Sequence, residues 1–169
     1  MSETAPSLYL ATNCYGGQAS AAYMQSVLVL RGACAGRCVG LHIELGGGEA
    51  LIGRARAAMM AKFLAGGWTH LLYVDSDGGF ETAAVFRMLD AGDDVAEDAG
   101  ALLISRSAAQ RMKDAHPHLH AHLDDVHALG IAGAAMVFDP MVDAATGRYL
   151  TDREAFAHRW RAIGGEIRT

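Results

Sequence analysis

One apolar run, His70-Leu71-Leu72-Tyr73-Val74, constrains the fold of this chain more than any other segment. Such a run is typical of a central parallel strand, because helices cover both of its faces. It ends directly in Asp75-Ser76-Asp77. In open α/β sheets, ligands bind at the carboxyl ends of the strands. We therefore expect Asp75 and Asp77 at a ligand-binding edge of a buried sheet.

Strand and helix patterns alternate along the rest of the chain. Short or alternating apolar segments predict strands, and apolar residues at helical spacing predict helices. The predicted strands are 8–12, 39–45, 70–74, 101–104 and 134–138, and the predicted helices are 18–30, 51–64, 82–91, 107–115 and 151–163. The acidic stretch 92–98 is expected to be a loop. This order favours a Rossmann-like three-layer α/β sandwich with a mostly parallel sheet.

Length and charge limit the class of protein. A chain of 169 residues fits a single domain, 1–169, with one core. The net charge of −5 and the lack of a Lys/Arg cluster argue against a nucleic-acid partner. The longest apolar run, 128–138, is too short to span a membrane, and no basic stretch precedes an apolar one near the start. The odd cysteine count suggests reduced thiols, so we expect a cytoplasmic protein.

Asp75 and Asp77 are the strongest candidates for chemistry. Two carboxylates two residues apart can reach one hard cation if the chain turns there, and Gly78-Gly79 makes the turn easy. The structural alternative is that Asp75 ends the strand and Asp77 starts a turn.

Two arginines precede this strand on the predicted helix, Arg54 and Arg56. Their spacing places them on different faces, so we expect only one to point into a site. An arginine suits phosphate because its planar guanidinium donates two parallel hydrogen bonds. Two solvent-exposed helix arginines are the equal alternative.

Thr151-Asp152-Arg153-Glu154 has the form of a helix capping box, in which Thr151 and Glu154 bond to each other's backbone. Capping alone explains the motif. In the functional interpretation, Asp152 lies at a helix N-terminus that faces the cleft, where it could act on an acceptor hydroxyl.

Two other groups of metal-ligand residues favour structural interpretations. Cys34 and Cys38 have a zinc-like spacing but lack a second pair. A set of histidines surrounds Pro117 and is best interpreted as a polar loop, although His120, Asp124 and His127 would align if they shared a helix.

Four segments, in order, resemble bacterial glycosyltransferases with a GT-A fold and a D-x-D motif. Residues 12–17 resemble the family's first nucleotide-binding loop. Residues 49–56 resemble its "LITRARN" helix start, and residues 70–77 its "HLLFLDSD" strand. Residues 147–165 resemble "GRYLSEDYAFCRRWRALGG".

The resemblance implies metal-assisted transfer of a sugar from a nucleoside-diphosphate sugar to an acceptor hydroxyl of carbohydrate type. Asp75 and Asp77 would bind Mn²⁺ or Mg²⁺, and Asp152 would be the catalytic carboxylate. The donor-binding residues would be Thr12, Asn13, Cys14, Tyr15, Arg54, Arg56, Asp75 and Ser76.

Three features depart from the family pattern. The second acidic residue of "SED" is Arg153 here. Only a short stretch separates Asp77 from residues 100–106, which resemble "GFMLIRR", whereas relatives carry a longer insertion there. The C-terminal histidine that often completes the metal site has no counterpart up to Thr169. We therefore expect a minimal version of the fold.

Two rival functions follow. The first is a catalytically inactive descendant that binds nucleotide or assembles with a partner, which the loss of the acidic residue favours. A shortened sheet would leave an edge that a second copy could cover, which allows a homo-oligomer. The second rival is a nucleic-acid enzyme of the Toprim type, which the acidic charge balance opposes.

Overall fold

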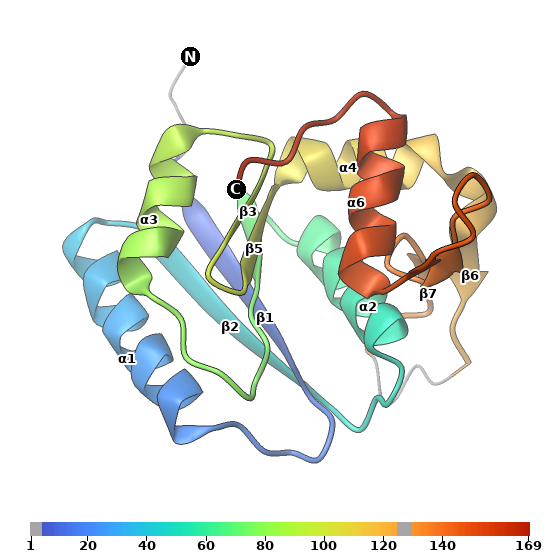
Figure 1. The fold of residues 1–169 in the computed structure, drawn as a ribbon. Coiled ribbons are helices and arrows are strands. Elements are labelled where there is room, and N and C mark those ends of the chain that lie inside the picture. The colour runs from blue at the N-terminus through green and yellow to red at the C-terminus, as the bar shows by residue number, and fades with distance from the viewer. Residues whose placement is uncertain (1–4, 125–129) are drawn as a thin grey trace.

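The centre of the protein is a five-stranded sheet in the order β2-β1-β3-β5-β4 (Figure 1). The computed structural model describes residues 5–124 and 130–169. The strands are β1 (Ser7–Cys14), β2 (Gly40–Gly47), β3 (His70–Tyr73), β4 (Val95–Asp98) and β5 (Ala101–Ser105). β1 pairs in parallel with β2 and β3, whereas β5 runs antiparallel to β3 and β4. Only β5 therefore opposes the common direction, and the predicted mostly parallel sheet is confirmed.

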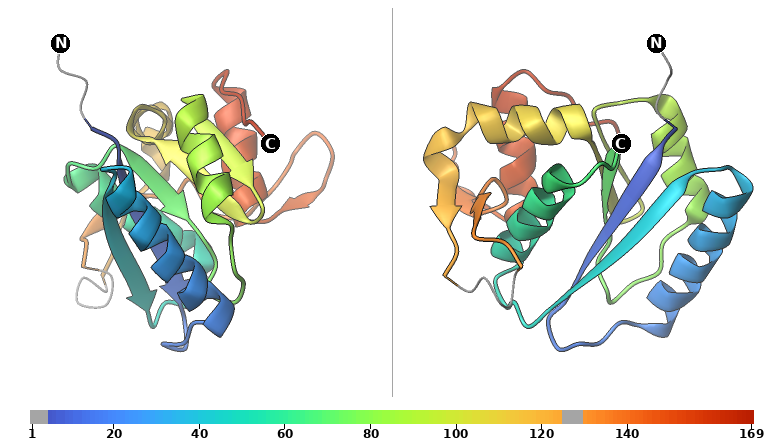
Figure 2. Two further views of the ribbon diagram at one scale, coloured as in Figure 1. Left: turned by 90° about the vertical axis from the view of Figure 1, so that its left-hand side faces the viewer. Right: turned by 180° about the vertical axis from the view of Figure 1, so that it is seen from behind.

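Helices cover both faces of this sheet, as the two views of Figure 2 show. α1 (Ala21–Gly36) and α3 (Thr82–Ala91) pack on one face, and α2 (Ile52–Ala65), α4 (Arg106–Ala115) and α6 (Asp152–Ala162) pack on the other. Each face has its own apolar core. Leu10 and Leu72 belong to the first core, and Tyr73 and Leu102 to the second. The buried run in β3 serves both cores, so the prediction of a three-layer α/β sandwich is confirmed.

Small elements extend the α2 side of the molecule. A 3₁₀ helix η1 (Pro117–Leu119) leads into β6 (His120–His122), which pairs antiparallel with β7 (Gly133–Ala135). β8 (Met141–Val142) and β9 (Tyr149–Leu150) form another antiparallel pair. The strand predicted at 134–138 is therefore only partly correct, because β7 lies outside the main sheet.

The histidine segment, predicted as a polar loop, contains the 3₁₀ helix η1 and strand β6, and the alternative of a helix shared by His120, Asp124 and His127 is wrong because His120 lies in β6. The β6–β7 pairing holds this segment extended and bonds the backbone of His120 to that of Ala135. His127 lies outside the described residues.

The loop predicted at 92–98 is also wrong in part, because Val95–Asp98 form edge strand β4. The two-residue turn Ala99-Gly100 joins β4 to β5, and both turn residues have positive φ angles of 47° and 83°. That conformation matches the twist of a hairpin, and glycine adopts it without strain. The acidic residues Glu97 and Asp98 lie at the end of β4 next to the turn, so a composition typical of loops concealed a short strand.

The membrane prediction can be compared with the helices directly. Among residues 5–124 and 130–169, no helix combines the length and the apolar character that a membrane span requires.

Close packing of Gly53 fixes the position of α2. A Cβ atom at Gly53 would lie 2.7 Å from the backbone oxygen of Phe138. A Cβ atom essentially never lies that close to another heavy atom, so a larger residue would push α2 away from the segment after β7. Arg56, one turn further along α2, depends on this position.

Replacing Gly53 by alanine should therefore destabilise the protein by about 1–3 kcal/mol, the usual cost of overpacking. The matched control is Gly32→Ala in α1, where a Cβ meets nothing within 4 Å. This control should stabilise the protein by about 0.5–1 kcal/mol, since alanine favours helix more than glycine does. Urea denaturation of both variants measures the difference, and equal effects would show that Gly53 is not closely packed.

Candidate functional site

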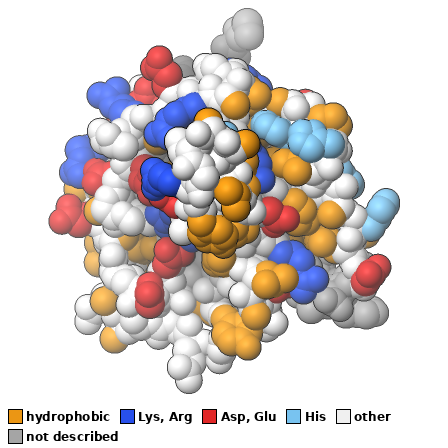
Figure 3. Space-filling view, turned by 45° about the vertical axis from the view of Figure 1, so that its right-hand side comes forward, with side chains coloured by type: hydrophobic (Ala, Val, Ile, Leu, Met, Phe, Trp, Pro, Cys, Tyr) orange, Lys and Arg blue, Asp and Glu red, His pale blue; other side chains and the backbone are white. Residues whose placement is uncertain are grey.

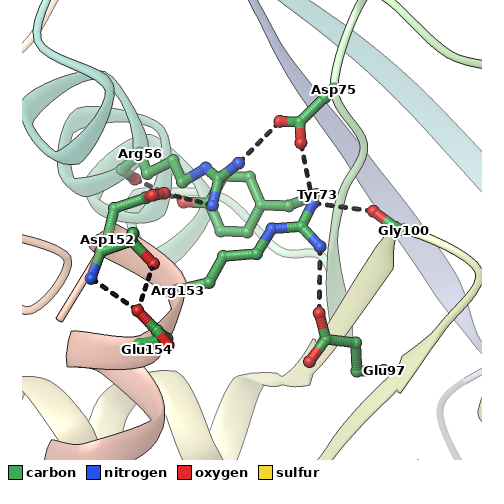
Figure 4. Close-up of polar contacts among 9 residues, drawn as sticks. Arg56, Tyr73, Asp75, Glu97, Gly100, Asp152, Arg153 and Glu154 are labelled. Carbon is green, nitrogen blue, oxygen red and sulfur yellow. Dashed lines mark hydrogen bonds and ion pairs between the residues drawn. The ribbon is translucent and has the colours of Figure 1, made fainter.

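Arg56 is a buried cation at the carboxyl edge of the sheet. Its side chain is 5% exposed, and it reaches from α2 toward the end of β3 (Figure 4). One guanidinium nitrogen donates to Asp75 Oδ1 at 2.6 Å, and the other pairs with Asp152 at the start of α6. A buried charge is stable only when it is paired, so the two carboxylates hold Arg56 in place.

Tyr73, the last residue of β3, contacts the same part of α2. Its hydroxyl donates to the backbone oxygen of Arg56, and its ring lies 5.7 Å from the Arg56 guanidinium carbon. Burial raises the pKa of the Tyr73 phenol, so this group stays a neutral donor. The last residue of β3 thus fixes the backbone that carries Arg56.

Arg153 is the second cation at this edge and comes from the first turn of α6. It donates to Asp75 Oδ2 at 3.2 Å, to Glu97 Oε1 at 3.1 Å and to the carbonyl oxygen of Gly100 at 2.7 Å (Figure 4). Both oxygens of Asp75 therefore accept from arginines, although its side chain is 54% exposed. We call Arg56, Asp75, Glu97, Asp152 and Arg153 the rim cluster.

The capping box predicted for α6 is confirmed. Glu154 accepts from the backbone N–H of Thr151 at 2.9 Å and from the Thr151 hydroxyl at 3.0 Å. These bonds, the backbone one first, lower the pKa of the Glu154 carboxyl. The cap fixes the first turn of α6, and this turn directs Asp152 and Arg153 toward β3.

The residues predicted in the first loop make their hydrogen bonds to residues outside the rim cluster. Thr12 is buried and accepts from the Tyr23 hydroxyl at 2.8 Å. Asn13 donates to the backbone oxygen of Glu49 at 3.2 Å. Cys14 is buried, which raises the pKa of its thiol, and a bond from Ser76 acts in the opposite direction. Tyr15 is exposed. Of these residues, Tyr15 thus presents the most surface to a ligand.

The other predicted site residues, Ser76, Asp77 and Arg54, are also not members of the rim cluster. The backbone oxygen of Ser76 accepts from Ser20 N–H at 2.8 Å, which joins this turn to the start of α1. Asp77 is exposed, and its carboxylate bonds to no residue in the described part of the chain. Arg54 pairs with Glu49 at 2.5 Å, away from Arg56. The prediction that only one of the two arginines points into the rim agrees with this arrangement.

Sequence reasoning missed Glu97, because it assigned residues 92–98 to a loop, and it gave Gly100 no role in a site. It treated Arg153 only as a lost acid and did not predict its bonds. The useful signal was the Ala99-Gly100 turn directly after an acidic pair, which is typical of a hairpin whose end carries charge.

The rim cluster has a mixed charge. Three carboxylates face two guanidinium groups, so the cluster carries one net negative charge. On the face shown in Figure 3, basic and acidic side chains are interspersed, and histidines gather at one side. This balance attracts a cation more than a bare phosphate.

The predicted Mn²⁺ or Mg²⁺ fits the chemistry of these donors but not their present arrangement. Carboxylate oxygens suit both ions. However, both oxygens of Asp75 are bonded to arginines, and no three His, Cys, Asp or Glu residues within 5–124 and 130–169 are grouped to hold a metal. An ion at Asp75 would have to displace Arg153, because Arg56 is buried and Arg153 lies nearer the surface.

Comparisons with known proteins leave the family open. No protein-family model matches the sequence, and no curated protein matches it. A similar solved structure is described as "Crystal Structure of A197 from STIV", with 15% identity and a TM-score of 0.37. The alignment covers 74% of this chain and 76% of that one, but similarity at this level carries no argument. The fold and the rim cluster define an α/β protein with a charged site at the carboxyl edge of its sheet. The resemblance to GT-A glycosyltransferases stays a prediction.

Replacing Arg153 by glutamine should increase Mn²⁺ affinity at Asp75. A unit charge about 4 Å away is worth about 1 kcal/mol even in water, so removing it should tighten binding of a divalent ion by roughly tenfold or more. The matched control is Arg148→Gln, which removes the same charge from an arginine that pairs with Glu154. Calorimetric titration with MnCl₂ measures both. Equal affinities in the two variants would show that Arg153 does not compete with the ion.

Proposed function

We propose that this protein binds a nucleoside-diphosphate sugar at the rim cluster and transfers the sugar to an acceptor hydroxyl. The observation that carries the proposal is the position of Arg56. A buried guanidinium lies at the carboxyl edge of a mostly parallel sheet and is held by carboxylates from two distant segments. Sites for phosphorylated ligands commonly occupy this edge of α/β sheets.

Charge explains why the donor would need a cation. The rim cluster is negative by one charge, and Asp77 adds another nearby. A diphosphate alone would be repelled by this balance, which a divalent ion would reverse. Mn²⁺ or Mg²⁺ therefore stays in the proposal, and it would stabilise the departing diphosphate as a Lewis acid.

The chain's own residues would hold the donor. Once Arg153 is released from Asp75, its guanidinium can bond to phosphate oxygens, since arginine matches phosphate geometry. Arg56 stays buried between Asp75 and Asp152 and keeps these two carboxylates in position. Tyr15 is an exposed aromatic residue in the loop after β1 and would contact the nucleoside. The acceptor would be of carbohydrate type, and a homo-oligomer and a cytoplasmic location stay predictions.

One observation favours a second candidate, an inactive protein that binds nucleotide or assembles with a partner. Arg153 bonds to Asp75, Glu97 and Gly100 together, so it closes the rim with three contacts. A protein that keeps this closure would bind nucleotide weakly and release no sugar.

Calorimetric titration of UDP, GDP, UDP-glucose and GDP-mannose tests both candidates, with and without Mn²⁺. We expect binding only with Mn²⁺, and its loss in Asp75→Asn/Asp77→Asn. The control Asp90→Asn/Asp114→Asn removes two charges from α3 and α4 and should bind normally.

Release of UDP or GDP from the sugar nucleotide distinguishes the candidates. Release supports sugar transfer, with water as acceptor, whereas binding without release supports the inactive protein. Absence of binding under all these conditions would contradict sugar transfer and nucleotide binding and would leave only assembly with a partner.

A further inference from the structure

Transfer to a hydroxyl by direct displacement, with inversion at the anomeric carbon, requires a base, and the structure narrows the choice of base. This inference rests on the proposed function. In the transfer step, the hydroxyl oxygen forms a bond to the anomeric carbon of the donor. The bond from that carbon to the diphosphate oxygen breaks, and its electron pair leaves with the diphosphate. When this displacement is direct and inverts the anomeric carbon, the proton of the hydroxyl passes to a base near the reacting atoms, and a carboxylate suits that role.

Three of the carboxylates at the rim are committed to other contacts. Asp75 accepts from arginines through both oxygens. Asp152 is 16% exposed and pairs with buried Arg56. Glu154 accepts both capping bonds from Thr151 through one oxygen and pairs with Arg148 through the other. Each would lose a structural contact on accepting a proton.

Glu97 differs from these carboxylates in both position and contacts. In the sheet, Glu97 pairs with Leu102, and Leu102 pairs with Tyr73, so the three side chains share one face. Asp75 lies two residues beyond Tyr73, just past the end of β3. Arg153 confirms the proximity, because its guanidinium bonds to both Glu97 and Asp75 (Figure 4).

The surroundings of Glu97 hold it in place and leave it accessible. Its backbone N–H donates to the backbone oxygen of Arg168 at 2.8 Å, which ties the C-terminal segment to β4. Its Oε1 accepts from Arg153, and its other oxygen makes no hydrogen bond in the described part of the chain. The side chain is 40% exposed.

We propose that Glu97 is the catalytic residue that accepts the proton of the attacking hydroxyl, and that Arg153 is the residue that positions it. The free oxygen of Glu97 takes the proton while Oε1 stays bonded to Arg153. The proton then passes to solvent. This assignment replaces Asp152, whose contact with Arg56 makes it a positioning residue.

Glu97→Gln tests the proposal, because glutamine keeps an oxygen that Arg153 can bond but cannot accept the proton. Release of UDP or GDP from the sugar nucleotides with Mn²⁺ gives kcat, and titration with UDP and Mn²⁺ gives Kd. We expect kcat to fall by about 10²- to 10⁴-fold, the usual contribution of a general base. Kd should stay within about threefold of that of the unmodified protein, and Glu97→Asp should recover part of the loss.

The neighbouring acid provides the matched control. Asp98 follows Glu97 in β4 and points to the opposite face, where it pairs with Arg87 at 2.7 Å. Asp98→Asn removes the same charge and should leave kcat unchanged. Asp152→Asn tests the rival base. It should lower the free energy of unfolding more than Glu97→Gln does, and it should lower kcat less.

Two results would overturn the assignment. One is a Glu97→Gln variant whose kcat lies within threefold of that of the unmodified protein, and the other is a selective loss of kcat in folded Asp152→Asn alone. Failure of the proposed function looks different, since the unmodified protein would then neither bind nor cleave the sugar nucleotides, and the assignment of Glu97 would fall with it.

Discussion

The buried guanidinium of Arg56 joins the parts of this protein that are distant in sequence. It emerges from α2, bonds to the carboxylate that follows β3 and pairs with the first residue of α6. A buried arginine without partners would carry a large desolvation cost, so the fold must bring both carboxylates to it. The direction of α6, and with it the position of Arg153, depends on this contact.

Asp75 shows how one local constraint determines the chemistry of the site. Its two oxygens are shared between a buried arginine and a partly exposed one. In the proposed function, the buried contact stays in place, and the contact with Arg153 exchanges with a ligand. The same carboxylate would then stabilise the fold through one oxygen and control access to the rim through the other.

Much of the fold could be predicted from local patterns. The run in β3 indicated burial on both faces, and the helix predicted at 82–91 has the bounds of α3. The strand β4 could not be predicted from its acidic composition, because its pairing with β5 depends on a turn with positive φ angles. For the site, the sequence placed Asp75 at the carboxyl edge. It could not decide between Arg54 and Arg56, because the rotation of α2 depends on the contact of Gly53 with Phe138.

The contact between the start of α6 and the end of β3 could not be predicted from local sequence patterns either. Arg153 and Asp75 are separated by 78 residues, and no pattern within either segment specifies the other. The capping box predicted the start of α6, yet the direction in which that start points is a tertiary property. The family resemblance suggested that these segments meet, but it implied an acid where this chain has an arginine.

A double-mutant cycle on Arg56→Gln and Asp152→Asn tests the central claim most directly, with free energies of unfolding from urea denaturation. Breaking a buried ion pair by removing one partner typically costs about 3–5 kcal/mol. We expect the Arg56 variant to approach this loss and the coupling energy between the two sites to reach about 1.5 kcal/mol or more. Effects that add to within about 0.5 kcal/mol would contradict the account, because they would show that Arg56 does not hold α6 against the sheet.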